Sequence, residues 1–385
     1  MSSLQRWVRE FGRPPRILGL DVARGLAIIG MAGAHIGDAP DLVWSDPETW
    51  AGIVHGRSSI LFAVLAGVSV ALMTGRSAGP DPQRLPSIRL GLVGRGAVVF
   101  VIGILLEYLN TPIAVILTLY GLIYVAVIPF LRWRPWQLLT AAGGLALLGP
   151  ALLALVNALT LHPFGAGIGF VISGSYPITV WMAFVFAGMA LGRLHVDTIR
   201  TAALTLFTGI GLAIIGYGLG AVGVAWGAAA DPGIPYQEAA PGWDGYPESL
   251  IATDPIGSMI RAVLAVDAHS GGTAEILGSG GFALAVIGAC LLASRAFRVP
   301  LLPLGALGSM PLSAYSAHIL VIALISGPGA FYTDGLFWVI LSLGLILVAT
   351  VWSVFAGQGP LERLTARAAR AMAAPPSAAR PRLDA

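Results

Sequence analysis

The stretch R-G-L-A-I-I-G-M-A-G-A-H, residues 24–35, places an arginine and a histidine inside an otherwise apolar segment. Arg24 and His35 are three helical turns apart, so both side chains lie on one face of a helix, separated by ~16 Å along its axis. A charged side chain at bilayer depth costs about 2.5–3.5 kcal/mol, which makes such a residue a candidate for function. We expect this segment to be the first membrane-spanning helix, with Asp21 on the same face.

The composition of the chain excludes a soluble domain. Of its 385 residues, 56% are hydrophobic and 11% are charged. A membrane span requires roughly 20 mainly apolar residues, and about ten such stretches follow one another along the sequence. Their centres lie near residues 27, 64, 99, 121, 147, 184, 213, 284, 313 and 346. We therefore predict an all-α integral membrane protein with about ten transmembrane helices.

The distribution of arginine predicts the orientation of these helices. All 22 basic residues are arginines, and most of them face one side of the membrane if the N-terminus is cytoplasmic, as the positive-inside bias requires. Acidic residues such as Glu48 and Glu248 collect on the opposite side. The N- and C-termini are then both cytoplasmic. The arginines flank the spans instead of forming one basic stripe, which argues against a nucleic-acid partner.

The sequence divides into three parts. Residues 1–16 are expected to form a cytoplasmic N-terminal segment, residues 17–356 a single polytopic membrane domain, and residues 357–385 a basic, partly disordered cytoplasmic tail. An extracytoplasmic loop rich in Pro, Gly, acidic and aromatic residues is expected at about 227–272, and it is long enough to cover a site. The helical beginning of the tail is expected to lie on the anionic inner leaflet.

Further ionisable residues fall within or beside the predicted spans and are candidates for function. They are His55 and Arg57 in the outer half of the second span, Arg95 and Glu107 at the inner and outer ends of the third, His269 in the long loop and His318 in the ninth. Structural explanations stay open beside the functional ones. Asp21 and Arg24, three residues apart, can pair and neutralise each other, and Arg95 can extend to the inner interface.

Residue types that are absent or isolated limit the chemistry. The sequence has no lysine, which excludes Schiff-base catalysis and a P-loop. Its single cysteine, Cys290, excludes a disulfide framework and a Cys-rich metal site. We expect no metal cofactor.

Several stretches resemble the transmembrane acyltransferase superfamily, which includes heparan-α-glucosaminide N-acetyltransferase, its YeiB-like relatives and the membrane acyltransferase-3 enzymes. L-D-V-A-R-G-L-A-I-I-G-M, residues 20–31, resembles the opening motif of the first two groups, and the spacing from Arg24 to His35 is similar to the acyltransferase-3 signature. Further similar stretches are S-I-L-F-A-V-L-A-G-V-S at 59–69, the pair Tyr315 and His318, and G-P-L-E-R-L at 359–364. The resemblance extends from residue 16 to residue 365.

This resemblance implies transfer of an acyl group, with acetyl-CoA as the expected donor, from cytoplasmic acyl-CoA to a hydroxyl or amine of a glycan or lipid-linked acceptor at the outer face. It places the chain in a bacterial plasma membrane, in contact with lipid, with a homodimer as one open oligomeric state. The expected donor-binding residues are Arg24, Arg95, Arg57, Asp21 and Tyr315. The expected catalytic base is His35, with Glu107 or a carboxylate of the outer loop as its acidic partner, and the alternatives are His55, His269 and His318.

The sequence leaves the catalytic histidine and the class of protein open. The proposed catalytic histidine of the glucosaminide acetyltransferase lies in the loop before the second span, and that loop contains no histidine in this chain. His55 follows shortly afterwards and therefore competes with His35. The alternative class is a proton-coupled small-solute transporter or permease, because intramembrane Asp, Arg and His residues can form a proton relay. The two halves of the sequence show no repeat that supports this alternative.

Overall fold

The computed structural model describes residues 2–37, 40, 42–43, 45–162, 165–173, 176–227 and 242–374. These residues form helices and connecting segments and contain no β-strand, which confirms the predicted all-α class. Most of the first half of the expected outer loop, at 228–241, and the end of the expected tail, at 375–385, lie outside the described residues.

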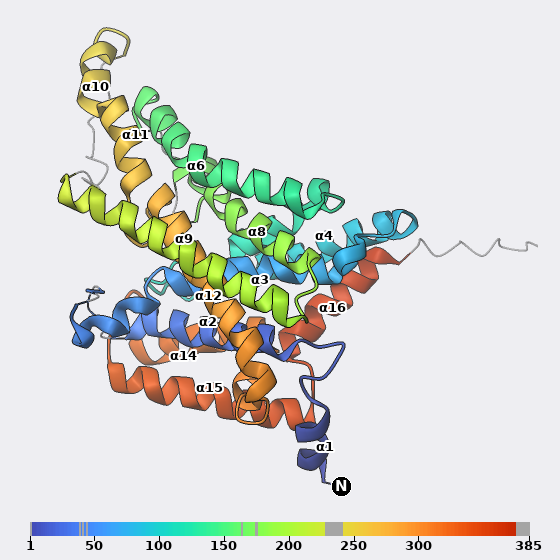
Figure 1. Ribbon diagram of the computed structural model, residues 1–385. Coiled ribbons are helices and arrows are strands. Elements are labelled where there is room, and N and C mark those ends of the chain that lie inside the picture. The colour runs from blue at the N-terminus through green and yellow to red at the C-terminus, as the bar shows by residue number, and fades with distance from the viewer. Residues whose placement is uncertain are drawn as a thin grey trace, which may run out of the picture.

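Sixteen α-helical segments follow one another along the described chain (Figure 1). They are α1 (Ser3–Glu10), α2 (Leu18–Ile36), α3 (Arg57–Met73), α4 (Leu85–Glu107), α5 (Leu117–Ala126), α6 (Pro135–Leu159), α7 (Ala166–Ile168), α8 (Ile178–Arg193), α9 (Ile199–Ala225), α10 (Tyr246–Thr253), α11 (Pro255–Leu264), α12 (Thr273–Ala296), α13 (Leu302–Gly308), α14 (Pro311–Ser326), α15 (Gly335–Phe355) and α16 (Pro360–Ala373). A 3₁₀ segment, Pro47–Val54, precedes α3.

All ten predicted span centres fall on helices, but not all ten helices are long enough to cross a bilayer. Within the described ranges, seven helices have the length and hydropathy of a span, and an eighth is formed if α13 and α14, bent by 83°, count together. The remaining two, α5 and α8, have 10 and 16 residues, fewer than the roughly 20 that a span requires. The multi-pass class is confirmed, and the apolar runs at 121 and 184 correspond to shorter helices.

Helix α2 lies at the centre of the helical assembly. It contacts α3, α12, α13, α14 and α15, and the last two run beside it on one face (Figure 1). Ile28 and Met31, which lie on the stripe between Arg24 and His35, are 0% and 3% exposed. The stripe that carries Arg24 and His35 is therefore surrounded by protein instead of lipid.

Close helix contacts at glycine set the position of α12. Helix α12 packs along α9, and a Cβ atom built on Gly216 of α9 would overlap the backbone of Gly278 of α12. Small residues permit this approach, which improves dispersion contacts between helices where lipid offers no hydrophobic driving force. The contact matters for the site because the N-terminal end of α12 carries a buried acidic residue, Glu275.

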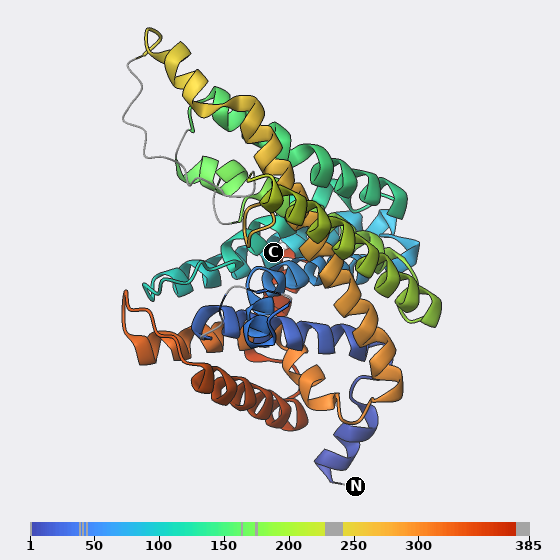
Figure 2. The ribbon, with the colours of Figure 1, turned by 60° about the vertical axis from the view of Figure 1, so that its left-hand side comes forward.

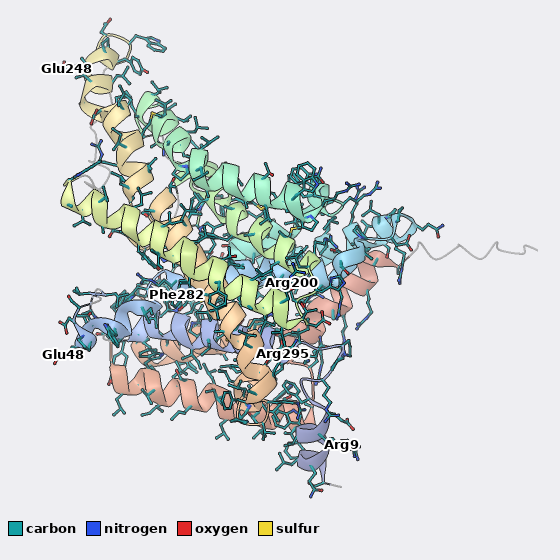
Figure 3. The ribbon with its side chains drawn as sticks, in the orientation of Figure 1. Arg9, Glu48, Arg200, Glu248, Phe282 and Arg295 are labelled. Atoms are coloured by element: carbon teal, nitrogen blue, oxygen red, sulfur yellow. The ribbon has the colours of Figure 1, made fainter. Side chains whose placement is uncertain are left out.

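Helices α10 and α11 form an arm that extends beyond the rest of the assembly. Both contact α6, and the two views show the arm beside the C-terminal end of that helix (Figures 1 and 2). Acidic Glu48 and Glu248 lie toward one end of the molecule, whereas Arg9, Arg200 and Arg295 lie toward the other (Figure 3). This separation of charge is the pattern on which the predicted cytoplasmic position of the termini depends, and that position stays a prediction.

The C-terminal helix is packed against other helices, and its expected position at the inner leaflet stays a prediction. Helix α16 packs against α4 and α14, and Gly94 of α4 approaches the backbone of Ala368. Thr365 is 2% exposed. The helical beginning of the expected tail is thus packed through Ala373, and the division of the chain at residue 357 stays a prediction.

Substitution of alanine at two glycines of α9 should separate packing from helix propensity. Gly216→Ala places a methyl group against α12 and should lower the free energy of unfolding by about 1–3 kcal/mol. Gly218→Ala gains the same propensity, about 1 kcal/mol, but its Cβ atom has no neighbour within 4 Å among the described residues. Thermal unfolding in detergent measures both. Equal melting temperatures for the two variants would contradict the close contact.

Candidate active site

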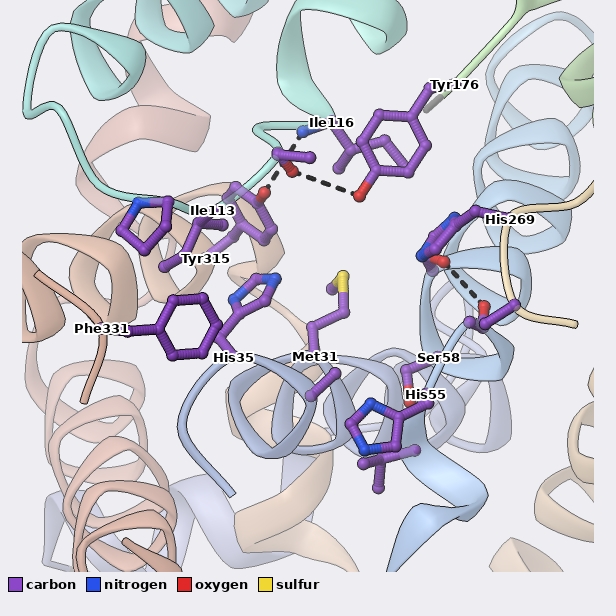
Figure 4. Close-up of a pocket in the computed structure, with 17 residues that line it drawn as sticks. Met31, His35, His55, Ser58, Ile113, Ile116, Tyr176, His269, Tyr315 and Phe331 are labelled. Carbon is purple, nitrogen blue, oxygen red and sulfur yellow. Dashed lines mark hydrogen bonds between the residues drawn. The ribbon is translucent and has the colours of Figure 1, made fainter. Parts of the chain in front are cut away.

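A cavity of about 260 Å³ lies at the end of α2 that carries His35. We call it the histidine cavity, because His35, His55 and His269 all line it. Figure 4 shows these three side chains around one space, although they come from α2, the segment before α3 and the segment before α12. The fold therefore brings together three of the predicted candidates that are distant in sequence.

His35 is paired with His318 of α14. Nδ1 of His35 lies 3.1 Å from Nε2 of His318, and the two rings are stacked with their centroids 5.3 Å apart. His318 is 0% exposed. A hydrogen bond between two neutral imidazoles needs one donor and one acceptor nitrogen. If Nδ1 of His35 donates, its Nε2 carries the lone pair that a general base requires.

Tyr315 lies next to this pair. It precedes His318 by three residues on α14, so both side chains lie on the same helical face, and their rings meet edge to face at 4.9 Å. The Tyr315 hydroxyl accepts a hydrogen bond from the backbone N–H of Ile116 at 3.3 Å. Tyr315 therefore lines the histidine cavity and contacts the start of α5, instead of lying with the arginines as expected for a donor-binding residue.

The loop before α12 presents His269 to the cavity. Its backbone N–H donates to Oε1 of Glu275 at 2.7 Å, and the His269 ring meets that of Tyr176 edge to face at 5.3 Å. Glu275 is 3% exposed. Glu275 was not among the residues selected from the sequence, although an acidic residue in the first turn of an apolar helix is the signal that could have identified it.

Desolvation at the cavity wall shifts the pKa of two groups outside the spans. Desolvation, and secondarily the charge of His55, lowers the pKa of His269 below its ordinary value of 6.5. Desolvation also raises the pKa of Tyr176 to about 12, and its hydroxyl donates to the carbonyl of Ala114 at 3.2 Å. At neutral pH both side chains are therefore uncharged hydrogen-bonding groups at the cavity wall.

A second cavity, of about 120 Å³, lies toward the other end of α2. Arg24 and Arg95 both line it, together with Ser69 and Glu362, and we call it the arginine cavity. Arg95 lies over the ring of Tyr124, with the guanidinium carbon 6.0 Å from the ring centroid. The fold thus brings two of the expected donor-binding arginines to one site.

Asp21 connects Arg24 to a second cation. Its carboxylate accepts from Arg24 at 2.6 Å and from Arg16 at 2.8 Å, and Asp21 is 3% exposed. Arg24 also donates to the Ser69 hydroxyl at 3.0 Å. The pairing of Asp21 with Arg24, which the sequence left open, is therefore present. Because one carboxylate serves two guanidinium groups, the cluster retains a net positive charge beside the arginine cavity.

Glu362 belongs to this site and was also missed by the sequence. It accepts from the backbone N–H groups of Leu312 and Ser313, at 2.7 and 3.1 Å, and from the Ser313 hydroxyl. These are orphan donors at the start of α14. The carboxylate thereby ties α16 to the broken helix that carries His318. The sequence feature that could have identified Glu362 is its negative charge within a tail that is mainly basic.

Two expected site residues lie elsewhere. Glu107 is exposed at the end of α4 and lines neither cavity, so the hydrogen-bond partner of His35 is His318 and not this carboxylate. Arg57 is absent from the arginine cavity. Its Nε donates to the Tyr217 hydroxyl at 2.7 Å, because α3 runs from the histidine cavity toward the arginine cavity and Arg57 is its first residue.

Among the residues that the structure describes, no group of three or more His, Cys, Asp or Glu side chains is arranged to hold a metal ion.

The fold and the two cavities define an all-helical membrane protein with histidines gathered at one internal site and arginines at another, both beside one central helix. Residues 16–217 match the family model described as heparan-alpha-glucosaminide N-acetyltransferase, catalytic. The match covers more than half of the chain, and the protein belongs to this family of membrane acetyltransferases. No curated protein matches the chain. Arg24, His35, His55 and Arg95 lie inside the matched region.

The lowered pKa of His269 predicts a pH dependence of stability. The unfolded chain binds a proton near pH 6.5, whereas the folded chain binds it only at lower pH, so stability falls as the pH drops below 6.5. Thermal unfolding between ~pH 7.5 and ~pH 5.5 should therefore lower the melting temperature more in the wild type than in His269→Gln. His195→Gln, at a position that lines neither cavity, is the control and should follow the wild type. Equal losses in all three proteins would contradict the shift.

Proposed function

We propose that the protein transfers an acyl group, specifically acetyl, from acyl-CoA bound at the cytoplasmic side to a hydroxyl or amine of a glycan or lipid-linked acceptor at the outer face of a bacterial plasma membrane. The observation that carries this proposal is the pair of cavities beside α2, one with arginines and one with histidines. The family match supports the acetyltransferase class, whereas nothing in it favours the transporter alternative.

The arginine cavity suits the anionic part of the donor. Guanidinium groups bind phosphate oxygens through charge-assisted and often bidentate hydrogen bonds. Arg24 is held by Asp21 and Ser69, so its guanidinium is oriented before a ligand binds. Arg95 supplies a second cation from α4. We propose that these two residues bind phosphates of acyl-CoA, with Asp21 as the orienting carboxylate.

The histidine cavity suits the transfer step. In the proposed reaction, Nε2 of His35 takes the proton of the acceptor hydroxyl or amine as its oxygen or nitrogen bonds to the acyl carbon. The carbon–sulfur bond then breaks, and His35 returns the proton to the departing thiolate, so that free CoA and the acylated acceptor are the products. His318 orients His35 by accepting from its Nδ1. His55, on the same cavity wall, is the alternative base.

Helix α2 sets the distance between the proposed phosphate-binding residue, Arg24, and the proposed base, His35. Arg24 and His35 are eleven residues apart on one face, or ~16 Å along the axis. The extended pantetheine arm of a donor is of comparable length. A donor whose phosphates occupy the arginine cavity can therefore direct its thioester toward the histidine cavity, while the acceptor enters from the other side.

Replacement of His35 tests the proposed base. His35→Ala should lower kcat for acetyl transfer by about 10²–10⁴-fold, the usual contribution of general base catalysis, while CoA still stabilises the protein thermally. Turnover is measured as CoA release that depends on added membrane extract as acceptor. His195→Ala, at an exposed position, is the control. If His35→Ala keeps full turnover and His55→Ala loses it, the base is His55.

Replacement of Arg95 tests the proposed donor site. CoA should raise the melting temperature of the wild type, because a ligand that binds only the folded state stabilises it. Arg95→Gln should lose most of this shift. Arg89→Gln removes the same charge from an exposed position of the same helix and should keep it. Equal shifts in both variants would place the phosphates elsewhere.

A further inference from the structure

The loop between α11 and α12 folds over the carboxylate of Glu275. Oε1 accepts from the backbone N–H of His269 at 2.7 Å, and Oε2 accepts from the backbone N–H of Gly271 at 2.7 Å and the Ser270 hydroxyl at 3.2 Å. Three consecutive residues thus donate to one side chain. Because that side chain is fixed to the first turn of α12, the loop takes its position from this helix.

The backbone of this loop is held in a conformation that needs such support. His269 has a φ of 65°, in the left-handed region that side chains other than glycine seldom adopt. The backbone N–H of this same residue donates the hydrogen bond to Glu275. Glu275 therefore stabilises the conformation that directs the imidazole toward the histidine cavity (Figure 4).

The same carboxylate lies close to the segment that carries His55. A Cβ atom built on Gly56 would be 2.8 Å from Cβ of Ala268 and 3.7 Å from Oε1 of Glu275. Gly56 has a φ of 69°, so the segment before α3 turns against the loop at this point. Glu275 thus lies behind two of the three histidines of the cavity, and within the described residues its carboxylate accepts hydrogen bonds from the His269 segment alone.

We propose that Glu275 is a positioning residue for His269, and that His269 donates a hydrogen bond from its ring N–H to the acyl carbonyl oxygen during transfer. This inference rests on the proposed function. As the acceptor attacks the acyl carbon, negative charge develops on that oxygen, and a fixed donor stabilises it. The charge returns to form the carbonyl when the carbon–sulfur bond breaks, so His269 neither gains nor loses a proton.

The neutral state of His269 suits this role. Burial lowers its pKa, so one ring nitrogen carries a proton and donates without placing a full positive charge in the cavity. His35, the proposed base, has one of its nitrogens occupied by His318. The two histidines therefore have different surroundings, and the different tasks of proton acceptor and hydrogen-bond donor follow from them.

A double-mutant cycle with Glu275→Gln and His269→Gln tests the proposal. In Glu275→Gln, the amide N–H₂ group faces one of the loop N–H or O–H donors, so one hydrogen bond is lost. This variant should lower kcat by on the order of 10²-fold, as loss of an oxyanion donor does. KM for acyl-CoA and the thermal shift with CoA should be unchanged. The double variant should be no slower than the slower single variant, because Glu275 acts through His269. Ser279→Ala, one turn further along α12, is the control with unchanged kcat.

Three outcomes would overturn the proposal. They are full kcat in Glu275→Gln, losses that multiply in the double variant, and coupling of Glu275→Gln to His55→Gln but not to His269→Gln. If Glu275→Gln fails to fold, Ser270→Ala removes a single loop donor, and its smaller loss of kcat should likewise vanish in the His269→Gln background. An inactive wild type overturns the proposed function itself, whereas an active wild type with an additive cycle overturns only the role of Glu275.

Discussion

The interaction on which the rest of the structure depends is the ion pair network around Asp21 in the central helix. A buried carboxylate is strongly disfavoured unless its charge is compensated and its oxygens are hydrogen-bonded. Asp21 meets both requirements through Arg16 and Arg24. Because these partners come from the chain just before α2 and from its second turn, the network fixes where the helix begins and how it is rotated. Its rotation then directs Arg24 into one cavity and His35 into the other.

The break between α13 and α14 leaves backbone N–H groups that need hydrogen-bond acceptors inside the protein. A helix that begins inside the protein exposes backbone N–H groups without intrahelical partners, and Glu362 accepts from two of them at Leu312 and Ser313. The carboxylate also interacts favourably with the positive end of the helix dipole. The C-terminal helix is for this reason part of the site. It holds the start of α14, and α14 in turn places His318 against His35.

Sequence patterns predicted the features that depend on a single helix, but they did not predict the contacts between helices. The three-turn spacing was sufficient to place Arg24 and His35 on one stripe, and hydropathy located all ten apolar segments. Nothing in a periodicity indicates that Glu275 would support a loop carrying His269, or that His318 and not Glu107 would contact His35, since these relations arise from packing between segments far apart in sequence. The shortness of α5 was hidden for a related reason, because apolar residues continue past both of its ends, at 113–116 and 127–131.

A histidine partner gives His35 different chemistry from the carboxylate partner predicted from the sequence. Both kinds of partner fix the ring and its tautomer, but a carboxylate also carries a negative charge that compensates an imidazolium as it forms. His318 supplies orientation without that charge. Charge balance in the proposed transfer must therefore come from rapid return of the proton to the leaving thiolate and from donors at the acyl oxygen. The His269 loop, held by the buried carboxylate of Glu275 on the same cavity, is placed to provide the second of these.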